Sequence, residues 1–194
     1  MTGEELVAFV EVQEWHRSGA ETYLAAASAQ VRLPHGPVTS REFVAKAIVS
    51  WTPDLARRAE EMTRRYRVLA DCGVRVPRLF AVRDAVIYQE FIPHHVTCEA
   101  VAGSEPLLRE VCMIAAALDA LGAQPTDFLR DLMCTSTEVY YVDVGEDLGG
   151  LFGAATQRAR QQLLDFLPET LRPRGEQLYD DAKRGLGLKG EQNA

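Results

Sequence analysis

Three aspartates lie in one short stretch of the chain, Thr126 to Gly150 (TDFLRDLMCTSTEVYYVDVGEDLGG). Asp127 and Asp131 are expected in a loop, and Asp143 follows a strand predicted over Glu138 to Val142. Three carboxylates at a loop and a strand end are hard to explain as core packing, because buried charges without partners are costly. Such a set could hold a divalent metal on a polyphosphate and orient a hydroxyl group toward it. The stretch is therefore a candidate metal and phosphate site.

Lysine is rare in this chain, which has 21 lysines and arginines but only three lysines, at positions 46, 183 and 189. Lys46 lies in an apolar segment, Phe43 to Val49, whose composition predicts a strand. Because a buried ammonium group without an anionic partner is costly, Lys46 is expected to pair with a carboxylate. The alternative is that Lys46 extends to solvent from the edge of its sheet.

A helix is predicted after this strand, because apolar residues recur at helical spacing from residue 55 to residue 69. At about 100° per residue, Glu61 lies beside the apolar stripe and Glu60 lies nearly opposite to it. Glu61 is therefore the better candidate to reach Lys46, although both glutamates could instead pair with nearby arginines. Thr52 is expected to cap the start of this helix.

The chain before residue 92 predicts mainly strands, and the chain after it predicts mainly helices. Residues 6–31 indicate a strand, a turn and a second strand, and the turn contains Ser18 and Gly19. This turn is either part of an ordinary hairpin or a loop whose N–H groups cover a phosphate. We also expect a loop at 31–41, strands at 79–82 and 85–92, and helices at 107–121, 151–167 and 176–186.

Composition excludes several classes of function. The net charge of -7 argues against general nucleic-acid binding, which requires a basic face. No apolar run is long enough to cross a bilayer, and the acidic N-terminus lacks the positive charge of a signal peptide. We expect a protein that is cytoplasmic, or secreted into a host cell by a route other than Sec. The four scattered cysteines predict neither a zinc site nor a disulfide framework.

The order of these features resembles the protein-kinase-like fold, which includes protein kinases and aminoglycoside phosphotransferases. A strand lysine, Lys46, precedes a helix glutamate, Glu61, by fifteen residues. The segment GVRVPRLF, at 73–80, resembles the link between that helix and the next strand in the phosphotransferases. The segment YQEFIP, at 88–93, is similar to the hinge on which adenine docks.

The aspartates continue the resemblance in the expected order. Asp127 with Asp131 is similar to the catalytic loop of this superfamily, and Asp143-Val144-Gly145 stands in the place of the kinase Asp-Phe-Gly. The resemblance covers about residues 6–150. It implies an α+β, bilobal protein-kinase-like fold. Residues 1–92 would form an N-lobe with an antiparallel five-stranded sheet and one helix. Residues 93–188 would form a reduced, mostly helical C-lobe, followed by a disordered tail at 189–194.

The resemblance also implies ATP and Mg²⁺ as cofactors. Lys46, held by Glu61, would contact the α- and β-phosphates. Asp143 would carry the metal, and Asp131, where the family has asparagine, would be a second metal ligand. Asp127 would accept or orient the proton of the substrate hydroxyl.

Main-chain groups would supply the other cofactor contacts that the resemblance implies. Ser18 and Gly19 would cover the phosphates. Glu90, Phe91 and Ile92 would offer donors and acceptors to adenine.

Three departures from the family pattern leave an inactive kinase fold open. Pro125-Thr126-Asp127 stands where His-Arg-Asp or His-Gly-Asp is expected, and the spacing from Asp127 to Asp131 is one residue short. The glycine-rich loop has one glycine. A catalytically inactive, nucleotide-binding pseudokinase module is therefore an alternative. The lysine and the three acids nevertheless remain, which favours activity.

The short region after Gly150 resembles that of pared-down bacterial kinases, among them secreted effectors that phosphorylate a host chaperone of the heat-shock-protein-90 type. We expect a monomeric serine/threonine protein kinase with a protein substrate, for example a chaperone, and without nucleic-acid or membrane partners. A small-molecule, antibiotic-type kinase is the first alternative. Transfer of another group from ATP, such as adenylyl, and a regulatory module that uses the fold as a scaffold also stay open.

Overall fold

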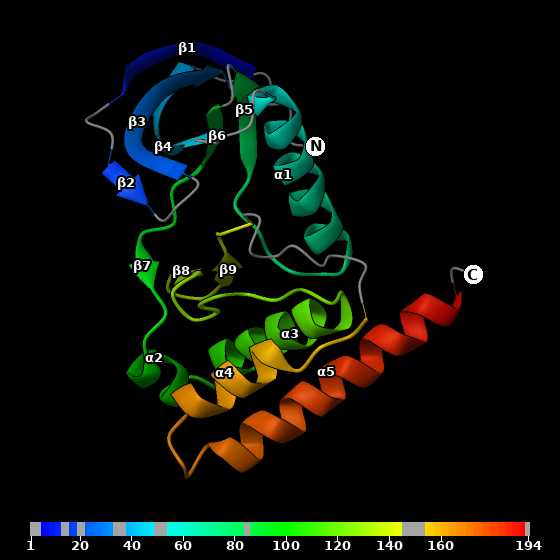
Figure 1. The fold of residues 1–194 in the computed structure, drawn as a ribbon. Coiled ribbons are helices and arrows are strands. Elements are labelled where there is room, and N and C mark those ends of the chain that lie inside the picture. The colour runs from blue at the N-terminus through cyan, green and yellow to red at the C-terminus, as the bar shows by residue number, and fades with distance from the viewer. Residues whose placement is uncertain are drawn as a thin grey trace. The chain divides into compact units, whose positions relative to one another are not determined.

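The computed structural model describes residues 5–12, 16–18, 22–32, 38–48, 54–83, 86–144 and 154–192. The chain divides into two compact units (Figure 1). The first unit contains Met1–Thr63 and Pro77–Phe91, and the second contains Arg64–Val76 and Ile92–Ala194. The α+β class expected from the sequence is confirmed. The division after Phe91 lies one residue from the expected boundary, whereas residues 64–76 belong to the second unit instead of the first.

The described part of the first unit contains a six-stranded antiparallel sheet in the order β1-β3-β4-β6-β5, with β2 paired to β3. Five strands were expected, and the short β2 is the addition. Within the predicted loop at 31–41, the described residues 31–32 and 38–41 are strand, because β3 and β4 continue their pairing as far as Arg32 and Val38. The strands are β1 (Glu5–Val12), β2 (His16–Ser18), β3 (Thr22–Arg32), β4 (Val38–Ile48), β5 (Leu79–Arg83) and β6 (Val86–Glu90).

The two faces of this sheet carry different side chains, because successive residues of a strand point to opposite faces. Phe43 and Ala45 of β4 are buried on one face, where the Phe43 ring meets the edge of Phe80 at 4.5 Å between centroids. Ile87 of β6 points to the other face and packs against Met62. That face is therefore the one covered by the helix that carries Met62.

The helix α1 (Leu55–Asp71) has the phase that the apolar spacing predicts. Met62, Tyr66 and Leu69 are buried, while Glu60 is exposed and Glu61 is half-buried. The side chain of Asp54 accepts a hydrogen bond from the Arg57 amide at 3.0 Å, as an N-cap residue does. The predicted cap, Thr52, lies outside the described residues.

Glycine ends α1 as it ends many helices. Gly73 has φ of 85°, in the left-handed region that side chains other than glycine rarely adopt. Its amide bonds to the Ala70 carbonyl at 2.9 Å, and the Val74 amide bonds to Leu69 at 3.0 Å. The chain therefore turns directly after the helix and returns to the first unit at Pro77.

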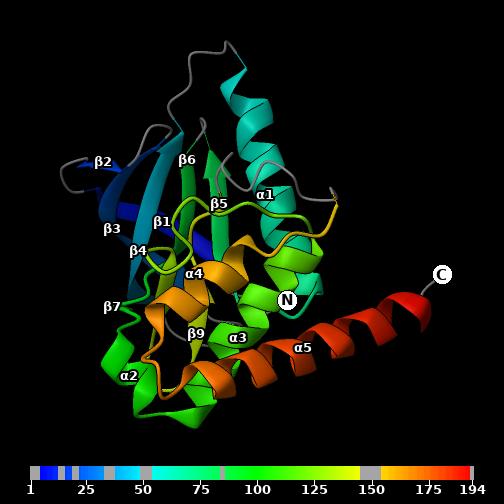
Figure 2. The same ribbon diagram turned by 60° about the horizontal axis from the view of Figure 1, so that its bottom comes forward.

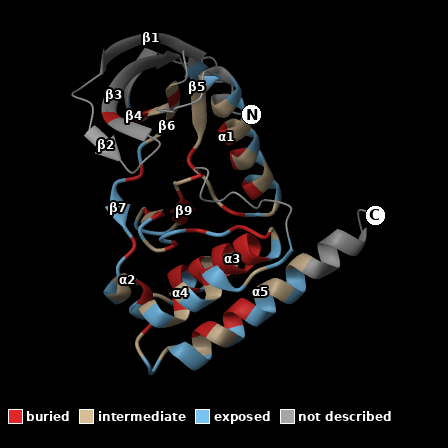
Figure 3. Cartoon of the chain, viewed as in Figure 1, coloured by how far each residue is buried: buried red, intermediate tan, exposed pale blue. Residues whose placement is uncertain are grey.

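The second unit is mostly helical in its described residues, as predicted. The helix α3 (Glu105–Ala120) is its core and contacts α2 (Cys98–Ala102), α4 (Arg158–Phe166), α5 (Arg172–Gln192) and the strand β9 (Val139–Tyr141). Figures 1 and 2 show α3 alongside α4 and α5, and Figure 3 shows that most of α3 is buried. A small antiparallel sheet joins β7 (His94–His95), β8 (Leu132–Cys134) and β9.

Several boundaries in this unit differ from the predicted ones. The helix α4 begins at Arg158 instead of residue 151, because the amides of Ala159 and Arg160 bond to the side chain of Asp119 in α3. The helix α5 begins at Arg172 and continues to Gln192, so part of the tail expected to be disordered is helical. None of the helices in the described part of the chain has both the length and the apolar character needed to span a bilayer.

Candidate functional site

The hairpin of β8 and β9 brings two of the predicted metal ligands together in the backbone. Leu132 pairs with Tyr141 across the hairpin, and the Val142 amide donates to the Asp131 carbonyl at 2.9 Å. Asp131 therefore lies opposite Val142, and Asp143 is the next residue along the chain. The sequence predicted a strand over Glu138 to Val142 with Asp143 directly after it, and the pairing places Val142 beside Asp131.

Asp127 occupies the turn that leads into β8. Its Oδ1 accepts a hydrogen bond from the Arg130 amide at 3.2 Å, and its carbonyl accepts one from the Asp131 amide at 3.3 Å. The carboxylate is exposed. Phe128, the next residue, is fully buried and stacks on the Tyr141 ring at 6.4 Å between centroids. The turn is thus held against the hairpin while Asp127 faces solvent.

Asp131 is almost fully buried, with 8% of its surface exposed. The Tyr141 hydroxyl donates to its Oδ2 at 3.2 Å. Asp143 is half-buried. Within the described residues, no three histidine, cysteine, aspartate or glutamate side chains form a group that could hold a metal. The three aspartates are therefore not a preformed three-carboxylate centre. Mg²⁺ commonly takes one or two protein carboxylates with phosphates and waters, and Asp131 with Asp143 fits that donor set chemically.

Lys46 is buried in the first unit, with 4% of its surface exposed, so the alternative that it extends to solvent from a sheet edge does not hold. It pairs across β4 and β6 with Ile87, which packs against Met62 of α1. Paired residues share a face, so Lys46 lies on the sheet face that α1 covers. Glu61 precedes Met62 and is half-buried. The pairing of Lys46 with Glu61 stays a prediction, supported by their common side of the sheet.

The predicted phosphate-covering residues lie at the limit of the described chain. Ser18 ends β2 and pairs with Thr22 of β3. Gly19 lies outside the described residues. Ser18, predicted to lie in the turn, is instead in a strand, and residues 19–21 between β2 and β3 lie outside the described part of the chain. The role of Ser18 in phosphate binding stays a prediction.

The predicted adenine-binding segment follows β6. The Glu90 amide donates to the Arg78 carbonyl at 2.9 Å, and the Glu90 Oε2 accepts from the Arg78 amide at 3.2 Å. The Glu90 amide hydrogen thus already has a partner inside the first unit. Phe91 is 44% exposed, and Ile92, where the chain re-enters the second unit, is buried.

Sequence reasoning missed Asp119, which is fully buried in α3. Its Oδ1 accepts from the Thr156 hydroxyl at 2.8 Å and from the Ala159 amide at 3.0 Å. Its Oδ2 accepts from the Arg160 amide at 3.0 Å and from the Tyr179 hydroxyl at 2.9 Å. Asp119 therefore caps α4 from another helix and sets its first residue. The available signal was a single acid in an otherwise apolar run, MIAAALDAL.

A second missed group joins α3 to the hairpin. Glu110 accepts from Arg75 at 2.8 Å and from the Val139 amide at 2.7 Å, and Arg75 also pairs with Glu138 at 3.3 Å. Burial alone would lower the pKa of Arg75, but the hydrogen bond and charge of Glu110 outweigh burial, and the pKa is raised. The group fixes β9 on α3.

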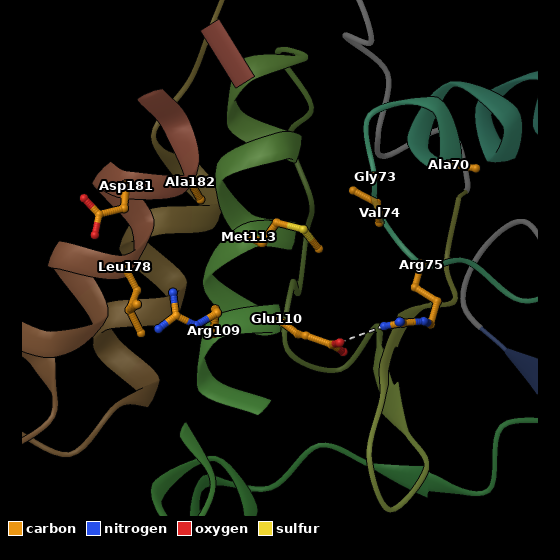
Figure 4. Close-up of a pocket in the computed structure, with 10 residues that line it drawn as sticks. All are labelled: Ala70, Gly73, Val74, Arg75, Arg109, Glu110, Met113, Leu178, Asp181 and Ala182. Carbon is orange, nitrogen blue, oxygen red and sulfur yellow. Dashed lines mark hydrogen bonds and ion pairs between the residues drawn. The ribbon is translucent and has the colours of Figure 1, made fainter. Parts of the chain in front are cut away.

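Beside this group lies an open groove of about 650 Å³ within the second unit (Figure 4). Figure 4 shows Arg75 and Glu110 meeting at one end, while Leu178 and Asp181 of α5 line the far wall. None of the site residues predicted from the sequence is among the described residues that line it. The lining residues are Ala70, Gly73, Val74, Arg75, Arg109, Glu110, Met113, Leu178, Asp181 and Ala182.

No protein-family model matches the chain, and a search of curated proteins finds no significant match. Family membership therefore rests on residue types, their spacing and the geometry above, and it remains a proposal.

Proposed function

We propose that the protein is an ATP- and Mg²⁺-dependent phosphotransferase with a bilobal protein-kinase-like fold, acting as a minimal serine/threonine protein kinase. The observation that carries this proposal is the β8–β9 hairpin. It aligns Asp131 with the residue before Asp143, directly after a turn that presents Asp127 to solvent. In protein kinases the carboxylate for the attacking hydroxyl precedes the metal-binding side chains along the chain, and the order Asp127, Asp131, Asp143 resembles that arrangement.

Each aspartate has a setting that suits its proposed role. Asp127 accepts or orients the hydroxyl proton of the substrate, and an exposed carboxylate can reach a group on another molecule. Asp131 and Asp143 would hold Mg²⁺. The bound metal neutralises charge on the phosphate oxygens. Burial of Asp131, with the Tyr141 hydroxyl on Oδ2, fixes the orientation of one of these ligands.

The first unit supplies the proposed nucleotide contacts. Lys46 contacts the α- and β-phosphates, and Glu61 orients it from α1. A lysine residue with 4% of its surface exposed is costly without an anionic partner, and both a carboxylate and a phosphate satisfy that need. Because the Glu90 amide is already bonded to Arg78, adenine would bind the remaining main-chain groups of residues 90–92.

One observation favours a second candidate, a nucleotide-binding module that does not transfer phosphate. Asp127 Oδ1 already accepts a hydrogen bond from its own turn, and the loop lacks the family's histidine. In that case Lys46 and Asp143 would still bind ATP and metal. A small-molecule kinase would use the same residues on a different acceptor.

The proposal predicts transfer of labelled phosphate that depends on Asp143. Purified wild type, Asp143→Asn and the exposed control Asp71→Asn would be incubated with γ-labelled ATP and Mg²⁺, with and without cell lysate. We expect label on a protein with wild type and with Asp71→Asn, and a loss of about 100-fold or more with Asp143→Asn. Thermal unfolding with ATP, with Mg²⁺ and with both would be measured in parallel.

The outcomes separate the candidates. Label on a protein band supports a protein kinase, and label on an added small-molecule acceptor alone supports the small-molecule alternative. A thermal shift that requires both ATP and Mg²⁺ but no transfer to any acceptor supports the non-catalytic module. The absence of both phosphate transfer and a thermal shift would contradict the proposed function. Loss of the shift in Lys46→Ala and in Asp143→Asn alike would show that both residues are required for binding of ATP and Mg²⁺.

A further inference from the structure

The amide side chain of Gln162, in α4, contacts the main chain on both sides of Asp127. Its Oε1 accepts a hydrogen bond from the Phe128 amide at 2.6 Å, and its Nε2 donates to the Pro125 carbonyl at 3.0 Å. The two bonds therefore enclose the two-residue segment Thr126-Asp127. A primary amide can form both at once, because it carries a donor and an acceptor side by side.

Gln162 is itself held in place by the packing of α4. Ala159 and Leu163, its neighbours on the helix, are fully buried. The start of α4 is fixed by the Asp119 carboxylate, which accepts from the Ala159 and Arg160 amides. A side chain that projects one turn after a fixed helix start has little freedom to move along the helix axis. The contact with the turn is thus made from a rigid element.

The contacts of Gln162 constrain the backbone directly before and after Thr126-Asp127. Phe128 is anchored in the core by its ring, and the carbonyl of the peptide group between Asp127 and Phe128 accepts the Asp131 amide at 3.3 Å. The bond from the Phe128 amide to Gln162, at 2.6 Å, is the shorter of the two bonds that fix the plane of that peptide group. The bond at Pro125 fixes the chain before Asp127. Together they set the direction in which the exposed Asp127 carboxylate leaves the backbone.

We propose that Gln162 is a positioning residue for Asp127: it holds the Pro125 carbonyl and the Phe128 amide so that the Asp127 carboxylate meets the hydroxyl of the substrate. This inference rests on the proposed phosphotransferase function. A displacement of about 1 Å in a catalytic group can cost about 100-fold in rate. A purely structural role would instead lower stability and leave the rate of the folded enzyme unchanged.

The test compares Gln162→Met with Gln161→Met, a matched change on the exposed side of α4, where Gln161 bonds only at the surface to Asp165. Two readouts are needed. Amide hydrogen exchange at Phe128, measured by NMR, reports the contact itself. The kcat and the KM for ATP, measured on protein shown to be folded by circular dichroism, report the positioning of Asp127.

For Gln162→Met we expect at least about tenfold faster exchange at Phe128 and a kcat lowered about 10- to 100-fold. The KM for ATP should stay within about twofold of wild type, because Asp127 does not bind the nucleotide. Gln161→Met should match wild type in both readouts. Where Gln162→Met fails to fold, Gln162→Glu retains the acceptor for Phe128 and loses the donor to Pro125, and its kcat should fall at least about fivefold.

Wild-type kcat in the folded variant, unchanged exchange at Phe128, or an equal loss in Gln161→Met would each overturn the inference. If wild type transfers no phosphate, the proposed function fails, and with it the catalytic part of this inference. The exchange measurement still decides the contact in that case. Faster exchange supports Gln162 as the residue that holds the turn, and unchanged exchange overturns that as well.

Discussion

The fold treats the carboxylates of Asp119 and Asp127 in opposite ways, although the two residues are eight positions apart. Asp119 is fully buried, and its two oxygens accept four hydrogen bonds, from a threonine, a tyrosine and two amides at the start of α4. Asp127 is exposed, and its Oδ1 accepts from an amide of its own turn. Both belong to the second unit, so burial and partners alone distinguish them.

This difference separates a carboxylate that holds a fold from one that is available for chemistry. Each donor around Asp119 would be left without its acceptor if the carboxylate were removed, which is costly in a buried site. Asp127 exchanges its contacts with water at little cost, so a substrate hydroxyl can compete for it. The comparison predicts a large loss of stability at Asp119 and a large loss of activity at Asp127.

Asp119→Ala should produce the largest loss of stability of the substitutions considered. It removes the cap of α4 and leaves the buried Tyr179 hydroxyl without its acceptor, so the free energy of unfolding should fall by about 3–5 kcal/mol. Urea unfolding followed by circular dichroism would measure it. Asp119→Asn keeps one carbonyl acceptor and should lose roughly half as much. A loss below about 1 kcal/mol for Asp119→Ala would contradict the structural role assigned to it.

The loss of stability at alkaline pH should report on the buried site of Asp119, because the Tyr179 hydroxyl donates to that carboxylate. Burial, followed by that hydrogen bond, raises the pKa of the Tyr179 hydroxyl above its ordinary value of 10.0. The neutral hydroxyl is thus favoured more in the folded than in the unfolded state. Its contribution to stability is full below pH 10 and is lost as pH rises above it. We expect the free energy of unfolding of wild type to fall above pH 10, and the fall to be smaller in Tyr179→Phe.

Cys112 needs its own control in this measurement. Burial raises the pKa of its thiol from 9.0 to about 12, so its contribution is full below pH 9 and is lost as pH rises through about 12. Cys112→Ala should therefore reduce the fall in the free energy of unfolding that begins near pH 9. Tyr179→Phe should reduce the part of the fall that begins near pH 10. Urea unfolding at intervals from pH 8 to pH 11 would separate them. If the free energy of unfolding falls equally with pH in Tyr179→Phe and in wild type, then the ionisation of Tyr179 does not cause the fall.

Much of the fold follows from periodicity, which one chain carries on its own. The apolar spacing of α1 placed Glu61 toward the packed side and Glu60 away from it, and the burial of both agrees. The strand before Asp143 was equally visible as a short run of valine and tyrosine residues, which favour strands. In each case the residues that decide the structure are neighbours in sequence, so local spacing was sufficient.

The features that were missed depend on contacts between distant segments. The start of α4 is set by Asp119, about 40 residues earlier, and no local signal at residue 158 announces it. Gln162 acts on Asp127 across a similar gap and resembles any polar residue of an amphipathic helix. The pairing of β3 with β4 beyond the apolar core likewise comes from backbone hydrogen bonds that side-chain composition does not report.

Asp127→Ala should have the smallest effect on stability and the most selective effect on function. It removes one exposed hydrogen bond to the Arg130 amide, at 3.2 Å, so the free energy of unfolding should fall by less than about 1 kcal/mol. Under the proposed function it also removes the group that receives or orients the hydroxyl proton, so kcat should fall by about 100- to 10,000-fold. Urea unfolding and label transfer on the same preparations would measure both, with Asp71→Ala as the exposed control. A loss of stability comparable to that of Asp119→Ala would mean that Asp127, too, is held by the fold rather than available to a substrate. Full activity in Asp127→Ala would show that the only role of the wild-type carboxylate is to stabilise its turn. The two aspartates would then differ in burial and not in function.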